Sequence, residues 1–259
     1  MVSLLKDRYI KYNFLLAELV KRDFKKKYKR TVLGVLWSLL NPLLNLLVMS
    51  LVFIHFFGND TPNFTIYVFS GLLVFNFFSE STNSGMSSLM ANAGILTKVK
   101  IPKYLFLLSK NVSVVIGFLL TLAVYFLFVA FSDLQFSFNF ILLIYPIITL
   151  TVFNIGVGLI LSALFVFFKD VQYLYDIFTR LVMFMSAIFY PTEHMSPQIQ
   201  QLFLINPIFA HIHYFRQIVL HGTIPSLQVH LIIGGYALMM FVIGGCIYKH
   251  YNHRFIYYM

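Results

Sequence analysis

The sequence has few charged residues and only one cysteine. Charged residues make up 11% of its 259 positions, whereas a soluble domain carries roughly a quarter. So little polar surface cannot cover a water-soluble globule, which excludes an ordinary soluble enzyme or binding domain. Cys246 is the only cysteine, so no disulfide can form within the chain.

Motifs for cofactors and metals are also missing. The sequence holds no G-x-x-x-x-G-K-[ST] loop, which indicates that the chain does not bind ATP by that route. It has neither C-x-x-C nor H-E-x-x-H, and His211 and His213 would fall on different faces of a helix. We therefore expect no catalytic site, no metal and no cofactor in this chain.

What the sequence has instead is long apolar runs. Hydrophobic residues make up 59% of the chain, and the mean hydropathy is +0.82. A helix needs about 20 apolar residues to cross a bilayer, and continuous runs favour helices over an alternating β-barrel. The sequence therefore predicts an all-α integral membrane protein with six transmembrane helices, at residues 32–57, 64–90, 105–131, 140–168, 173–190 and 227–248.

The basic residues are concentrated on one side of these spans. The net charge is +10, which in a soluble protein would suggest nucleic acid but here indicates loops held at the cytoplasmic face. Of the 19 lysines and arginines, ten precede the first span, eight lie in alternate loops and at the C-terminus, and only Arg216 lies on the other side. We therefore predict that both termini are cytoplasmic and that the chain has no nucleic-acid partner.

Two segments outside the spans have the features of membrane-associated helices. Residues 1–31 are basic and amphipathic, which predicts a cytoplasmic interface helix before a transmembrane domain at 32–259. A charge cluster that only sets the topology is the alternative. Residues 191–226 carry four prolines between apolar stretches that are too short to span. This external segment predicts two re-entrant helices, with a partly buried surface loop as the alternative.

Polar residues recur at helical spacing inside the predicted spans. We single out Asn41 and Asn45 in the first span, and Asn76 and Asn83 in the second. Each row forms a narrow stripe that will not face lipid, so its amides either line a polar pathway or hydrogen-bond between packed helices. Packing is favoured for the row in the third span, which consists of Ser109, Ser113, Gly117 and Thr121.

Two further features concern charge and aromatic content. Asp176 and Arg180 lie four residues apart near the start of the fifth span, where we expect an ion pair to lower the cost of both charges. Aromatic residues make up 18% of the chain, with 30 phenylalanines and 16 tyrosines. Their flat apolar rings can stack on the apolar faces of sugars, so they would suit a path for a glycan.

A series of short motifs resembles the polysaccharide-export permeases of the type-2 ATP-binding-cassette (ABC) exporter family. This family includes O-antigen, capsule, teichoic-acid and rhamnan exporters. The resemblance covers essentially the whole chain, and the opening run is its most specific part. The motifs are Arg22-Asp23-Phe24-Lys25 with Tyr28, Leu33 to Trp37, Asn41-Pro42-Leu43, Lys98 to Lys103, Phe168 to Val171 with lysine in place of the usual arginine, Ile188 to Pro191, Asn206-Pro207 and Phe215-Arg216.

The resemblance implies how the chain is assembled. It implies a homodimer joined to two copies of a separate ATPase subunit, which would bind ATP and Mg²⁺. It also implies a coupling helix in the first cytoplasmic loop, residues 91–104. The contact residues there would be Asn92, Lys98, Lys100 and Lys103.

The resemblance further implies an aromatic-lined channel around the first, second and fifth spans. As a hypothesis, the substrate path would then contain Asn41, Asn45, Asn76, Asn83 and Tyr190. A gate is expected where the fifth span meets the external segment and its re-entrant helices. The residues expected there are Pro191, Asn206, Pro207 and Arg216.

Together these observations predict a permease subunit that exports a lipid-linked polysaccharide across a bacterial cytoplasmic (inner) membrane. ATP hydrolysis would take place on the partner subunit, and the chain itself would not be an enzyme. One alternative is an ABC exporter of drugs or lipids. Another is a membrane-embedded enzyme of glycan or lipid synthesis, which should show clustered acidic or histidine residues at a membrane edge.

Overall fold

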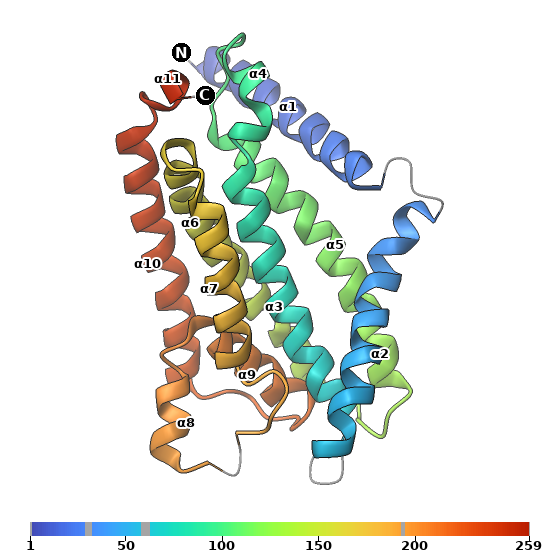
Figure 1. Ribbon diagram of the computed structural model, residues 1–259. Coiled ribbons are helices and arrows are strands. Elements are labelled where there is room, and N and C mark those ends of the chain that lie inside the picture. Colours follow the sequence, from blue (N-terminus) through green and yellow to red (C-terminus); the bar gives the residue numbers. More distant parts are fainter. Residues whose placement is uncertain (1, 29–32, 58–62, 193–194, 259) are drawn as a thin grey trace.

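The protein is a bundle of helices (Figure 1). The computed structural model describes residues 2–28, 33–57, 63–192 and 195–258, and within them it contains helices and no strands. The expected boundary between residues 31 and 32 lies outside the described residues. The helices are α1 (Val2–Tyr28), α2 (Trp37–Phe57), α3 (Phe64–Ser87), α4 (Ala93–Leu96), α5 (Tyr104–Ala130), α6 (Ile144–Phe167), α7 (Val171–Met185), α8 (Pro197–Phe203), α9 (Pro207–Val219), α10 (Leu227–Tyr251) and α11 (Phe255–Tyr258), with 3₁₀ turns at Gly34–Leu36, Met90–Asn92 and Phe138–Leu143.

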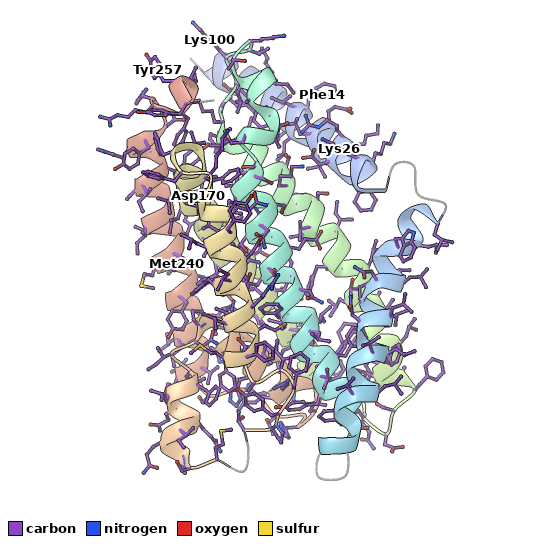
Figure 2. The ribbon with its side chains drawn as sticks, viewed as in Figure 1. Phe14, Lys26, Lys100, Asp170, Met240 and Tyr257 are labelled. Carbon is purple, nitrogen blue, oxygen red and sulfur yellow. The ribbon has the colours of Figure 1, made fainter. Side chains whose placement is uncertain are left out.

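Both ends of the chain lie at the same end of this bundle. Figure 1 shows α1, α4 and α11 together there, with α8 and α9 at the opposite end. Lys26 and Lys100 are at the end that holds the termini (Figure 2). The apolar part of α3 is 78% buried, against 22% for that of α10, so α3 is the more central of the two.

The all-α membrane class is confirmed. Among the described residues, four helices are long and apolar enough to cross a membrane: Phe64–Ser87, Tyr104–Ala130, Phe138–Phe167 and Leu227–Tyr251. Large apolar side chains project from the outside of the bundle, as Leu231 and Leu238 do on α10, each 66% exposed. Such a surface is suited to lipid rather than to water. Helix α7 has 15 residues, so the count of six spans stays a prediction.

Among the described glycines, the closest helix contact joins α6 and α10. A Cβ atom on Gly156 would overlap the backbone of Met240, and one on Gly244 would overlap the carbonyl of Gly156. Small residues let membrane helices approach backbone to backbone, where van der Waals packing is strongest. A second close approach joins α3 to α6, since a Cβ on Gly85 would lie 3.2 Å from the Cα of Gly158.

Helix α7 ends earlier than the sequence indicates. A span was expected over residues 173–190, but the helix stops at Met185 and Ala187 adopts the left-handed conformation, with φ of 47°. A positive φ is uncommon for a residue other than glycine. Here the carbonyls of Ala187 and Ile188 turn toward the guanidinium of Arg216. Because these contacts lie far apart in the sequence, the apolar pattern alone could not show the break.

Candidate functional site

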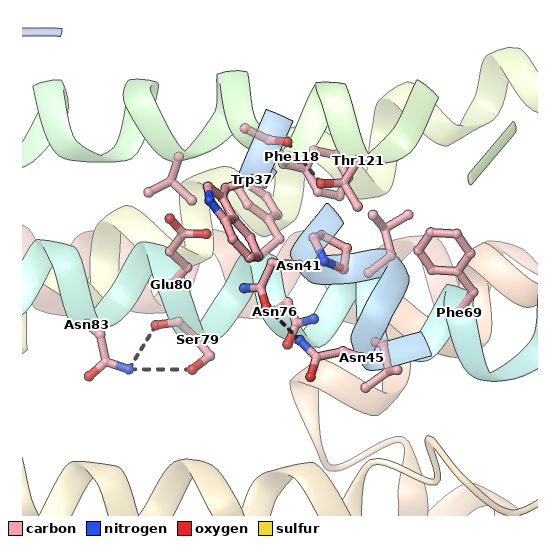
Figure 3. Close-up of a pocket in the computed structure, with 16 residues that line it drawn as sticks. Trp37, Asn41, Asn45, Phe69, Asn76, Ser79, Glu80, Asn83, Phe118 and Thr121 are labelled. Carbon is pink, nitrogen blue, oxygen red and sulfur yellow. Dashed lines mark hydrogen bonds between the residues drawn. The ribbon is translucent and has the colours of Figure 1, made fainter. Parts of the chain in front are cut away.

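A cavity of about 640 Å³ opens between α2, α3 and α5. Figure 3 shows its polar side chains converging from these helices. It brings together all four asparagines singled out from the sequence. The lining residues are Trp37, Asn41, Pro42, Asn45, Phe69, Leu72, Leu73, Asn76, Phe77, Ser79, Glu80, Asn83, Val114, Gly117, Phe118 and Thr121.

Helix α3 supplies the longest wall of the cavity. Asn76, Glu80 and Asn83 recur every three or four residues and therefore share one face. Asn76 and Glu80 are exposed, while Asn83 is half-buried and its amide donates to the carbonyl of Ser79 at 2.9 Å. Among the described lining residues, Glu80 is the one with a charged side chain.

Helix α2 supplies the opposite wall. Asn45 Nδ2 donates to Asn41 Oδ1 at 3.2 Å, one helical turn away (Figure 3). Both residues are exposed, so each keeps donors and acceptors that face the cavity. A side-chain amide in contact with lipid would be costly, so these groups are suited to a wet or ligand-filled space.

Helix α5 closes the cavity with residues that were expected to pack against other helices. Gly117 and Thr121 belong to the small-residue row of the third predicted span, and both line the cavity. The Thr121 hydroxyl donates to the Gly117 carbonyl at 3.1 Å, and its oxygen can still accept. The N-terminal part of the same row does pack, since Ser109 is fully buried. Residues of one row, at the same helical spacing, therefore pack against other helices near the start of α5 and line the cavity further along it.

Aromatic rings complete the wall. The rings of Phe77 and Phe118 stack with centroids 4.4 Å apart, and Trp37 lies at the α2 side. Trp37 was not among the predicted path residues, although it is the only tryptophan and stands one turn before Asn41. Amides that donate and accept, combined with flat apolar rings, can bind a molecule with many hydroxyls and apolar faces.

The fifth predicted path residue, Tyr190, lies elsewhere. It does not line the cavity; its backbone carbonyl accepts from the Tyr67 hydroxyl at 2.9 Å, and its own hydroxyl donates to Phe184 at 2.8 Å. Next to it, Asn206 caps α9 by accepting from the amides of Ile208 and Phe209. The Asn206 amide also donates to the Met185 carbonyl at 3.2 Å, which ties the start of α9 to the end of α7.

Arg216 joins the helices at this end of the bundle through buried contacts. It was expected with the re-entrant helices of residues 191–226, and it lies in α9, where it is only 5% exposed. Its guanidinium carbon lies 3.4 Å from the centroid of the Tyr67 ring. The fork donates to Ser70 Oγ and to the carbonyls of Tyr67, Ala187 and Ile188, at 2.9 to 3.2 Å. Arg216 therefore joins α3, α9 and the turn after α7.

The predicted coupling residues divide into two pairs. Lys98 and Lys100 are exposed. Asn92 is buried, and Lys103 donates to the Asn252 carbonyl and lies 5.6 Å from the centroid of the Phe255 ring. Burial lowers the pKa of Lys103. Only the first pair is therefore free to reach another molecule.

Asp176 and Arg180 do not form the ion pair that we expected. The ion pairs among the described residues do not join them. Both line a smaller cavity of about 340 Å³, which also contacts Ser79 and Asn83. Water in this space can hydrate the two charges, which removes the need for a direct pair.

A helical membrane bundle with a polar, aromatic cavity is typical of a membrane transport protein. Residues 15–220 match the ABC-2 type transporter family. Because this match covers most of the chain, the chain belongs to that family, and the family predicted from the motifs is confirmed.

Relatives match over nearly their full lengths. The chain is 27% identical to the O-antigen export system permease protein RfbA of Klebsiella pneumoniae, over 95% of this chain and 97% of the relative. It is 26% identical to the RfbA protein of Myxococcus xanthus, over 98% of each chain. It is 22% identical to the polysialic acid transport protein KpsM of Escherichia coli, over 88% of this chain and 90% of the relative.

Proposed function

We propose that this chain is the transmembrane permease subunit of an ABC transporter that exports a lipid-linked polysaccharide across a bacterial cytoplasmic membrane. The observation that carries the proposal is the cavity between α2, α3 and α5, where Asn41, Asn45, Asn76 and Asn83 meet aromatic rings. The relatives named for O-antigen and polysialic acid transport support the same substrate class. The chain would make no covalent bond; it would supply a path that changes shape.

The path is tested by adding bulk to it. Asn45→Trp would fill the cavity, so we expect export to be lost while the protein still assembles. Val48→Trp is the matched control, because Val48 is 54% exposed and does not line the cavity. Surface polysaccharide and the amount of assembled protein in the membrane should both be measured. Normal export by Asn45→Trp at normal assembly would show that the cavity is not the path.

The proposed assembly is a homodimer with two ATPase subunits, which bind ATP and Mg²⁺. We call residues 91–104, where the coupling helix is expected, the coupling segment. The exposure of Lys98 and Lys100 in this segment supports a contact with the ATPase there. Lys98→Glu with Lys100→Glu should weaken copurification of the ATPase, since two cations become anions at the contact. Lys249→Glu with Arg254→Glu is the control, as it makes the same charge change at exposed positions near the C-terminus. Equal copurification by both double variants would rule out the coupling segment as the contact.

The proposed orientation has both termini in the cytoplasm, as the distribution of lysine and arginine indicates. Single cysteines in a Cys246→Ser background can test it. Phe138 and Tyr257 are 91% and 86% exposed, and they lie before α6 and in α11. A membrane-impermeant thiol reagent should label Phe138→Cys in intact cells and Tyr257→Cys only after permeabilisation. The reverse labelling pattern would show that the termini lie outside the cytoplasm and that the proposed topology is wrong.

A further inference from the structure

The motif Arg22-Asp23 near the end of α1 has no role in the function described so far. Asp23 is a charged residue whose side chain is only 3% exposed. A buried carboxylate is expensive unless several partners compensate its charge. The partners of Asp23 come from α1 itself and from α5.

Two cations and one hydroxyl surround the Asp23 carboxylate. Oδ1 accepts from Arg22 Nε at 3.1 Å and Nη2 at 2.8 Å, and Lys110 Nζ lies 3.3 Å from the same oxygen. Oδ2 lies 3.2 Å from Ser109 Oγ. The Ser109 hydroxyl is also 2.9 Å from the Phe106 carbonyl, and its single proton can serve one acceptor at a time.

Arg22 extends the group to a third element. Its Nη2 also donates to Asn92 Oδ1 at 2.9 Å, and Asn92 Nδ2 donates to the Ser88 carbonyl at 2.7 Å. Asn92 ends the 3₁₀ turn that leads directly into α4 of the coupling segment. We call this group the α1 joint; it consists of Arg22, Asp23, Asn92, Ser109 and Lys110.

The α1 joint lies close to the cavity along α5. Lys110 and Val114 are one helical turn apart, and Val114 begins the face of α5 that lines the cavity and continues through Gly117, Phe118 and Thr121. A movement of the coupling segment at Asn92 therefore has a hydrogen-bonded route to the cavity wall. Loops without such contacts would absorb the movement.

A second ion pair on the same helix shows what an ordinary surface contact looks like. Glu18 and Lys21 are 3.9 Å apart, with side chains 54% and 61% exposed. Exposed pairs of this kind contribute little. Asp23 differs from this pair because it is buried and because its contacts join α1 to α5.

We propose that Arg22 and Asp23 are positioning residues that couple movement of the coupling segment to α5 and thus to the cavity wall. The proposal rests on the proposed function, because it requires an ATPase that moves the coupling segment. Through the α1 joint, α1, the coupling segment and α5 move as one body during the transport cycle.

The test uses the full transporter, permease and ATPase together, in membrane vesicles that contain the lipid-linked glycan. The readout is glycan exported per ATP hydrolysed, for equal amounts of assembled complex. Asp23→Asn keeps the shape but removes the charge, and we expect hydrolysis to continue while this ratio falls about tenfold, within the usual range of coupling between sites. Glu18→Gln makes the same acid-to-amide change on the exposed pair and should leave the ratio unchanged.

Arg22→Lys is the second variant, for the case in which Asp23→Asn does not assemble. Lysine keeps the charge but lacks the planar fork that reaches Asp23 and Asn92 together, so the ratio should again fall. A normal ratio in the variants that assemble would overturn the proposal, and so would a parallel loss of hydrolysis and export, which indicates a merely structural role. If the wild-type complex itself exports no glycan, the proposed function fails first.

Discussion

Helices α6 and α10 meet backbone to backbone, whereas α2 contacts α3 and α5 but leaves an open cavity between them. Gly156 and Gly244 leave no room for a side chain between α6 and α10. On α2, Leu46 is buried, but Leu47 and Leu51 are 55% and 69% exposed. Both regions are strongly apolar in sequence, so hydrophobicity does not separate them. Small residues mark the close contact and amides mark the open one.

The difference indicates that two regions of the chain have different roles. The packed region, formed by α3, α6, α9 and α10, fixes the shape of the bundle. The open region, formed by α2 and the cavity faces of α3 and α5, offers polar groups to a passing molecule. Substitutions in the first region should change stability, and those in the second should change transport.

The largest effect is expected at the closest helix contact. Gly156→Leu would force side-chain atoms into the backbone of Met240, and we expect a loss of about 3 kcal/mol or more of stability, the upper part of the range for overpacking. Gly245→Ala is the control, because a Cβ there meets nothing within 4 Å. Thermal unfolding of the detergent-purified protein measures both. Equal melting temperatures would remove the distinction between the two regions.

A smaller but clear loss is expected at Arg216. Arg216→Met keeps the unbranched apolar stem of the side chain but removes the guanidinium and its hydrogen bonds to three buried carbonyls, which we expect to cost about 2 to 3 kcal/mol. Arg180→Met removes an exposed arginine from α7 and should change the melting temperature little. If both variants melt alike, the guanidinium of Arg216 does not hold α3, α9 and the turn after α7 together.

The smallest effect distinguishes two asparagines of opposite kinds. Asn154 is fully buried in α6, and neither of its amide atoms has a partner among the described residues. Asn154→Leu should therefore stabilise the protein by up to about 1 kcal/mol, since an unpaired buried amide is costly. Asn76→Leu, in the cavity, should leave the melting temperature unchanged and lower export.

This prediction is checked by measuring unfolding and surface polysaccharide for both variants. A drop in stability with Asn154→Leu would show that its amide has a role in packing. Unchanged export with Asn76→Leu would place that residue outside the path. Either result would weaken the comparison between the packed and the open region.

Much of the fold and the four asparagines of the cavity could be predicted from the sequence. Asn76 and Asn83 share a stripe because helical periodicity is a local property, and the stripe does face the cavity. The same property misled us on α5, because Ser109 and Thr121 share a row while one packs and the other lines the cavity. Periodicity gives the face of a helix but not what that face meets.

Contacts between distant positions could not be predicted in this way. Arg22 meets Asn92 across 70 residues of sequence, and Asp23 meets Ser109 across 86. The separate position of Tyr190 likewise depends on the left-handed turn at Ala187, which only the approach of Arg216 makes understandable. From the sequence alone, a charged pair in a basic helix, such as Arg22 and Asp23, is expected to be exposed, because its distant partners are not known.

The contact of Lys103 with Asn252 and Phe255 has a practical consequence for how the protein is handled. The C-terminal tail therefore holds Lys103, near the end of the coupling segment, in place. Truncation after Tyr251 would expose the Lys103 amine, whose pKa would rise toward its ordinary value because burial now lowers it. Deletions and purification tags are therefore safer away from this tail.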